Sequence, residues 1–180
     1  MPISIWLDLL LTVLVVSAAV TDLAIRKIPN LFLLLAWCAV ISLHLADTAP
    51  LPAIGTALGG ALVGFALFLP LYVVRGMAAG DVKLMSTVGL FLGPAEAVQA
   101  CIFTWCAGGI MALVMILFTR RWSDAYANLR SLLLPMVRIG PTVQAASLTR
   151  PSVGSMPYGL AIAVTTLWLL AQRYFPTISL

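Results

Sequence analysis

Long apolar segments separated by short polar breaks are the feature of this sequence that most constrains its fold. Of the 180 residues, 62% are hydrophobic and only 9% are charged, whereas a soluble domain carries about 25% charged residues. So few charges cannot cover the surface of a water-soluble globule, and so apolar a chain does not remain disordered. A membrane-spanning helix needs about 20 mainly apolar residues. We therefore expect one all-α, polytopic membrane domain over residues 1–180 with six transmembrane helices, at residues 3–20, 31–46, 53–74, 78–93, 95–118 and 157–172.

The fourth segment decides the number of spans. Its apolar part, residues 84–93, would be a helix of about 15 Å, half the roughly 30 Å hydrocarbon core. Beginning the helix at Ala78 lengthens it to about 24 Å, which predicts a short span in a locally thinned membrane. With six spans and the N-terminus outside, nine of the ten Lys and Arg residues lie in inside loops, as the positive-inside rule requires. The net charge of +4 then indicates orientation in the bilayer rather than affinity for nucleic acid.

The long polar break between the fifth and sixth segments predicts an amphipathic helix on the cytoplasmic leaflet. Its apolar side chains recur at near-helical spacing among arginines. We favour a simple interfacial linker over a surface that presents substrate. The residues that set the spacing are Trp122, Tyr126, Leu129, Leu133 and Met136.

A stripe of glycines marks the third segment and predicts close helix packing. Such a stripe lets two helix backbones approach each other. A six-helix bundle has many internal contacts to make, so we favour internal packing over a dimer interface, and the oligomeric state stays open. The stripe consists of Gly55, Gly59, Gly60 and Gly64.

Two polar breaks each place one aspartate at the cytoplasmic end of a predicted span. Asp22 follows the first span and Asp81 begins the fourth, so the topology puts both at a similar depth on one side. Ionisable groups at membrane depth are costly and usually functional. Two neighbouring carboxylates share a proton, so that one acts as a general base toward water and the other as a general acid toward a peptide carbonyl. Gly80 would let a backbone approach closely beside Asp81.

The residues alone leave a simpler interpretation open. Each aspartate could cap a helix or pair with a nearby cation, Asp22 with Arg26 and Asp81 with Lys83 or Arg75. Among the other candidate catalytic residues, Asp8 lies about 21 Å along the first helix from Asp22. We expect it to be a helix-end residue. The single histidine and the three cysteines form no metal-binding spacing, and we expect no metal and no cofactor.

Two motifs and a closing segment resemble the type IV prepilin peptidases, membrane aspartic proteases of the Gly-x-Gly-Asp class. The segments are residues 22–30 (DLAIRKIPN), residues 76–84 (GMAAGDVKL) with the glycines that follow, and residues 157–161 (PYGLA). The chain looks most like the short form that serves Flp/Tad-type pili, because nothing matches the zinc-binding methyltransferase domain of larger members. One position departs from the motif, where Ala78 stands in place of the first glycine.

The resemblance implies a catalytic pair, Asp22 and Asp81, that cleaves the basic leader of pilin precursors. It also implies a bacterial cytoplasmic membrane protein that acts at the inner face, with its N-terminus outside and with prepilins and the lipid bilayer as partners. The matched motifs imply these substrate-binding or site-shaping residues: Gly80, Ala78, Lys83, Arg26, Pro29, Asn30, Pro157 and Gly159.

Three alternatives remain at this stage. A presenilin-like protease would share the Gly-Asp element, but its first aspartate would lie in a Tyr-Asp pair. A channel or transporter subunit would use Asp22 and Asp81 as an ion site, although such sites usually lie near mid-membrane. A non-catalytic subunit for pilus assembly would need neither carboxylate for chemistry.

Overall fold

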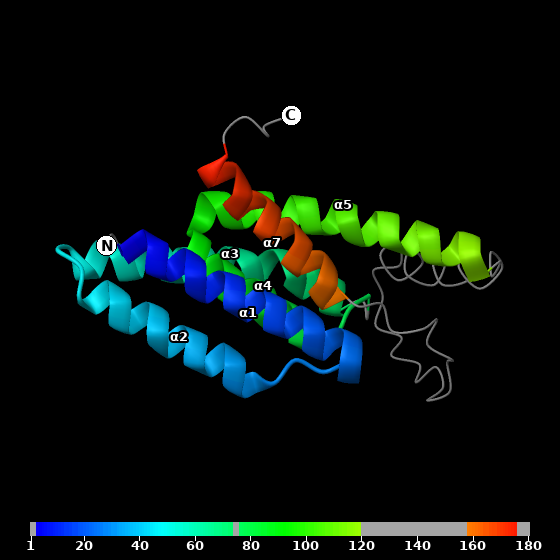
Figure 1. Ribbon diagram of the computed structural model, residues 1–180, viewed down its shortest axis with the longest axis horizontal. Helices are drawn as coiled ribbons and strands as arrows, with labels where there is room; N and C mark the ends of the chain where they lie inside the picture. Colours follow the sequence, from blue (N-terminus) through cyan, green and yellow to red (C-terminus); the bar gives the residue numbers. More distant parts are fainter. Residues whose placement is uncertain (1–2, 74–75, 120–157, 176–180) are drawn as a thin grey trace, which may run out of the picture. The chain divides into compact units, whose positions relative to one another are not determined.

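The computed structural model describes residues 3–73, 76–119 and 158–175, and within these ranges the protein is built from helices alone (Figure 1). This confirms the all-α prediction. The predicted interfacial helix and Pro157 lie outside the described residues. The helices of the described ranges are α1 (Ile3–Ile25), α2 (Asn30–Leu45), α3 (Pro50–Val73), α4 (Ala79–Leu92), α5 (Pro94–Thr119) and α7 (Tyr158–Tyr174).

Among the helices that the structure describes, three are long and apolar enough to cross a membrane by length and composition. They are Ile3–Ile25, Pro50–Val73 and the stretch Pro94–Val114 of α5. They indicate a membrane protein. The other helices are shorter, and α4, with 14 residues, reaches only about 21 Å. Six spans therefore stay a prediction.

The bounds of α1 and α4 differ from the predicted segments. α1 continues past Val20 to Ile25, so that Asp22 lies inside the helix rather than in the loop that follows. Backbone hydrogen bonding continues wherever φ and ψ allow it, whether or not the side chains are apolar. α4 begins at Ala79, one residue after the predicted start.

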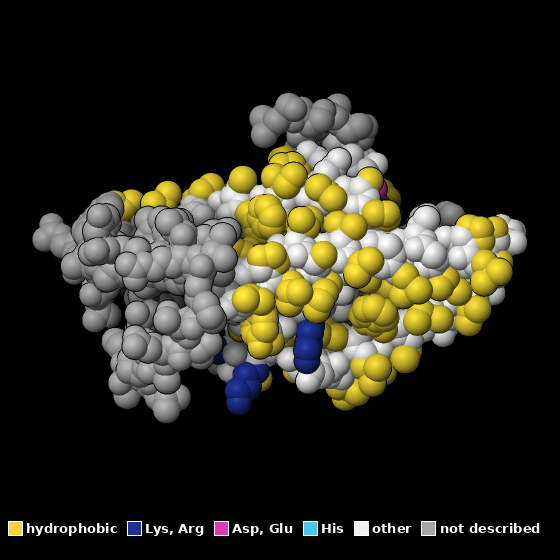
Figure 2. Space-filling model, turned by 180° about the vertical axis from the view of Figure 1, so that it is seen from behind, with side chains coloured by type: hydrophobic (Ala, Val, Ile, Leu, Met, Phe, Trp, Pro, Cys, Tyr) yellow, Lys and Arg dark blue, Asp and Glu magenta, His cyan; other side chains and the backbone are white. Residues whose placement is uncertain are grey.

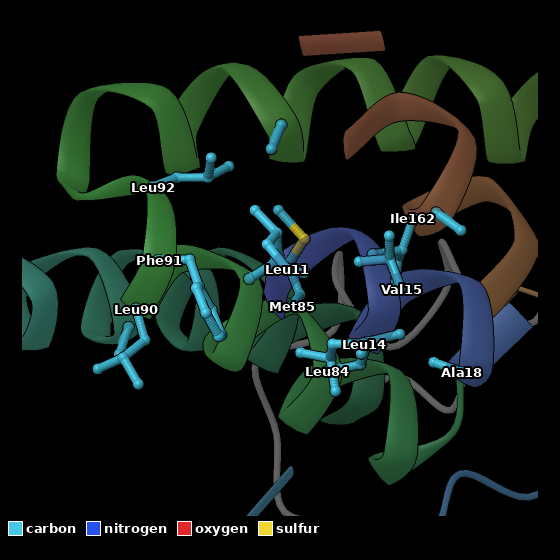
Figure 3. Close-up of a cluster of buried hydrophobic side chains, with 14 of the residues drawn as sticks. Leu11, Leu14, Val15, Ala18, Leu84, Met85, Leu90, Phe91, Leu92 and Ile162 are labelled. Atoms are coloured by element: carbon cyan, nitrogen blue, oxygen red, sulfur yellow. The ribbon is translucent and has the colours of Figure 1, made fainter. Parts of the chain in front are cut away.

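The chain divides into two compact units. The first comprises residues 1–108 and 157–180, and the second comprises residues 109–156, of which the structure describes the end of α5. In the first unit, α4 packs most extensively on α3, and α1 packs on α7. α1, α4 and α7 share one apolar core, where Leu11 and Val15 meet Met85 and Ile162 (Figure 3).

Glycines bring α3 and α4 into backbone contact. A Cβ atom added at Gly60 would collide with the Gly89 carbonyl and would lie 2.7 Å from Gly93 Cα. One at Gly64 would lie 2.5 Å from the Met85 carbonyl oxygen. The glycine stripe thus serves internal packing at these two positions, as predicted, whereas a Cβ at Gly55 would meet nothing within 4 Å among the described residues.

Large apolar side chains remain exposed on the helices. Val13 of α1 and Leu62 of α3 are 66% and 67% exposed. On the face in Figure 2, hydrophobic side chains are spread over the described surface, while the visible Lys and Arg side chains lie at one edge. This distribution fits a surface that faces lipid, because lipid tails accept apolar side chains without penalty.

An ion-pair network joins α1, α5 and α7 at the end where α1 begins. Arg173 donates to the Asp8 carboxylate at 2.7 Å and also pairs with Glu96. The Tyr174 hydroxyl donates to the second Asp8 oxygen at 2.8 Å. Asp8 is therefore a buried, paired residue of α1 rather than the helix-end residue that its position suggested.

We predict that G60A destabilises the protein and that G55A does not. The added methyl group at position 60 meets backbone atoms, which no side-chain rotation relieves, so the loss should be about 1–3 kcal/mol. Thermal and denaturant unfolding in detergent micelles, followed by circular dichroism, measure the difference. Equal stability of the two variants would contradict the close contact between α3 and α4.

Candidate functional site

Asp22 lies in the last turn of α1 and is only 7% exposed. The helix ends directly after this turn because Arg26 adopts a left-handed backbone conformation, with φ of 54°. The Arg26 amide donates to the Asp22 carbonyl oxygen at 3.1 Å, which completes the helix end. A left-handed conformation costs a non-glycine residue about 1–2 kcal/mol. The surrounding fold therefore enforces the end of α1 one helical turn after the aspartate.

The start of α7 holds the Asp22 side chain. The Gly159 amide donates to Asp22 Oδ2 at 2.9 Å. Amides in the first turn of a helix have no partner within the helix and favour a negative group. A Cβ atom at position 159 would lie 2.9 Å from Oδ2 and 3.1 Å from Cγ of Asp22, so only glycine leaves room for the carboxylate there.

Asp81 occupies the first turn of α4 and is 5% exposed. The Ala78 amide donates to Asp81 Oδ2 at 3.2 Å, and the Asp81 amide donates to the Ala78 carbonyl oxygen, also at 3.2 Å. Ala78 itself has φ of −80° and ψ of 153°, an extended conformation open to any residue. Alanine in place of the motif glycine therefore causes no backbone strain at this position.

The two aspartates lie at the same end of the first unit. α1 and α4 pack on each other, and the Asp22 charge acts electrostatically on Asp81. Both side chains are buried among apolar helices, where the low dielectric strengthens their interaction. The packing of α1 on α4 thus brings two carboxylates that lie far apart in the sequence within electrostatic range, and their action as a catalytic pair stays a prediction.

The segment between α1 and α2 runs beside the start of α4. Ile28 lies next to Gly80, where an added Cβ would meet the isoleucine side chain at 3.7 Å, an ordinary contact distance. Pro29 precedes the first residue of α2, Asn30, whose side-chain oxygen accepts a hydrogen bond from Lys83 Nζ at 3.2 Å. Among the described residues Lys83 thus binds Asn30 rather than Asp81, and the predicted site-shaping residues of both motifs meet here.

Tyr158 is a further neighbour of the aspartates and is not among the predicted site residues. It is the first residue of α7, directly before Gly159, and lies within electrostatic range of Asp81. Its ring contacts α5 at Gly108, where an added Cβ would lie 2.8 Å from the ring. In the sequence, Tyr158 could have been identified by its position between Pro157 and Gly159, which are both predicted site residues.

A second group of polar side chains lies away from the two aspartates. A cavity of about 310 Å³, lined in part by His44, Thr56 and Glu96, borders the C-terminal end of α4, away from Asp81 at its start. The described ranges contain no cluster of three His, Cys, Asp or Glu side chains that would hold a metal ion. Asp22 and Asp81 therefore remain the candidate site residues.

Comparison with known proteins gives a family match. A family model described as the type IV leader peptidase family matches residues 9–113, more than half of the chain, including Asp22 and Asp81. No curated protein and no solved structure matches the chain.

We predict that G159A lowers stability and that G80A does not. The methyl group at position 159 must displace the Asp22 carboxylate and break its hydrogen bond, which should cost about 1–3 kcal/mol. The methyl group at position 80 makes only an ordinary contact with Ile28. Thermal unfolding of both variants in the same detergent tests this. A stable G159A protein would contradict the close approach of α7 to Asp22.

Proposed function

Because this chain belongs to the type IV leader peptidase family, we propose that it is a membrane-embedded aspartic endopeptidase that removes the leader of Flp/Tad-type prepilins. Membership in the family implies leader peptidase activity in general. The Flp/Tad-type substrate, the catalytic pair and the orientation in the membrane are our proposal.

The observation that carries the proposal is the burial of two carboxylates, Asp22 and Asp81, within electrostatic range of each other. Both are buried, they lie on different helices, and Asp22 acts electrostatically on Asp81. Separate backbone amides, from Gly159 and Ala78, hold one oxygen of each carboxylate. An isolated structural cap would not require a second buried carboxylate within electrostatic range.

Such a pair hydrolyses a peptide bond without a nucleophilic side chain. The ionised carboxylate removes a proton from water, and the water oxygen bonds to the peptide carbonyl carbon. The protonated carboxylate gives its proton to the carbonyl oxygen. The tetrahedral intermediate then collapses, and the C–N bond breaks as the carboxyl group that took its proton from water protonates the leaving amine. One hydroxyl of the intermediate returns its proton to the other carboxylate as the C=O bond re-forms. Both carboxylates return to their starting states.

A prepilin would approach the pair with its apolar helix in the lipid and its basic leader in the cytoplasm. A prepilin presents a basic leader followed by an apolar helix, and its scissile bond must leave helical geometry to expose a carbonyl. Gly80, directly before Asp81, carries no side chain that would obstruct an extended strand. We infer that the site faces the cytoplasm at the inner membrane, with the N-terminus outside, because this orientation keeps nine of ten basic residues inside.

We predict that D22N and D81N each abolish leader removal. An amide can neither remove a proton from water nor supply one to the carbonyl oxygen, so the rate should fall at least 100-fold. The measurement is cleavage of a Flp-type prepilin by the purified enzyme in proteoliposomes, followed by mass spectrometry of the product.

The matched control for this prediction is D47N. Asp47 lies in the turn after α2, and its carboxylate binds only the neighbouring Thr48 among the described residues, so the same change there should leave cleavage intact. Normal cleavage by D22N or by D81N would sink the proposed mechanism and favour a structural or ion-binding role for the pair.

A further inference from the structure

Tyr158 stands out as a polar group beside the pair that the proposed mechanism does not use. It begins α7, so the same turn that binds Asp22 through the Gly159 amide also carries the Tyr158 ring. The ring is partly buried. α7 packs on both α1 and α4, the helices that carry the two aspartates.

A glycine on α5, Gly108, leaves room for the Tyr158 ring and fixes its position. At Gly108, an added Cβ would lie 2.8 Å from Tyr158 Cε1 and 3.4 Å from Cδ1, so the ring lies against the helix backbone. Further along the same two helices, the hydroxyls of Thr104 and Thr165 are joined by a buried hydrogen bond of 2.8 Å. α5 and α7 are thus held together at two levels, which restricts the movement of the ring.

The Tyr158 hydroxyl makes no hydrogen bond with the residues that the structure describes. Tyr174, at the other end of the same helix, donates its hydroxyl to Asp8 at 2.8 Å. A phenol is both a donor and an acceptor, and a buried one usually has a partner. The Tyr158 hydroxyl therefore remains available to a bound molecule, one residue from the amide that holds Asp22.

We propose that Tyr158 is a further catalytic residue, whose hydroxyl donates a hydrogen bond to the carbonyl oxygen of the scissile peptide. This inference rests on the proposed function. The carbonyl oxygen has two lone pairs: one receives the proton from the carboxylic acid of the pair, and the other accepts the phenol hydrogen bond. The phenol proton stays on the phenol oxygen throughout, so Tyr158 stabilises the negative charge that develops as water adds. Gly108 acts as a positioning residue that leaves room for the ring.

The first experiment compares Y158F with Y72F in the same prepilin cleavage assay. Tyr72 is an exposed residue near the end of α3, so the identical loss of a hydroxyl there controls for the chemistry of the change. We expect kcat of Y158F to fall about 100-fold with little change in KM, because the bond forms as charge develops. Y72F should match the parent enzyme.

The second experiment tests the space at Gly108 with a double-mutant cycle. G108A should reduce kcat because its methyl group displaces the Tyr158 ring, whereas G109A should not, since an added Cβ there meets nothing within 4 Å among the described residues. In the Y158F background G108A should cost nothing further, because no hydroxyl remains to be misplaced. A purely structural role for the ring would leave the two losses additive.

The outcomes separate this inference from the proposed function. A loss in kcat of tenfold or more for Y158F, with unchanged thermal unfolding, supports the inference, and a smaller loss overturns it. If D22N and D81N abolish cleavage while Y158F retains it, only the role of Tyr158 fails. If D22N or D81N still cleaves, the proposed function fails first. If Y158F does not insert into the membrane, the comparison of kcat between G108A and G109A tests the role of Tyr158 instead.

Discussion

The hydrogen bond from the Gly159 amide to the Asp22 carboxylate joins residues 137 positions apart, and the arrangement around the aspartates depends on it. It places the first turn of α7 against the last turn of α1. At the opposite end of the same two helices, Arg173 and Tyr174 bind Asp8. α1 and α7 are therefore an antiparallel pair bound through a carboxylate at each end. In an apolar surrounding, where hydrophobic burial discriminates weakly between helix faces, such polar contacts define which helices meet and at what level.

The position of Asp81 depends on a different constraint, the backbone contact between α3 and α4. Gly60 and Gly89 face each other without side chains between them, and Gly64 faces the Met85 carbonyl. α4 is short, and with 14 residues it would span only about 21 Å. Close packing on the longer α3 gives this short helix a fixed level, which sets the depth of Asp81 relative to Asp22.

Much of the site was predictable because a charged residue in so apolar a chain is rare. Asp22 and Asp81 could be selected from six acidic residues by their place at the ends of apolar segments. The internal role of Gly60 and Gly64 also followed from their spacing. Other features of the fold and of the site could not be predicted from the sequence. The pairing of Asp8 needs Arg173 from the other end of the chain, and the extended conformation at Ala78 depends on where α4 begins. Tyr158 carries no local sign of its relation to Asp81.

The sequence by itself determined the class of the protein, the approximate helices and the two carboxylates, because these follow from local composition and from the free energy of moving charge into lipid. Only the tertiary structure decided which amide holds each carboxylate, and that Tyr158 lies against Gly108 beside them. The reason is that helices in an apolar surrounding present apolar residues on every face, so periodicity does not reveal their rotation. Contacts between residues far apart in the chain set that rotation, and they exist only once the helices have packed.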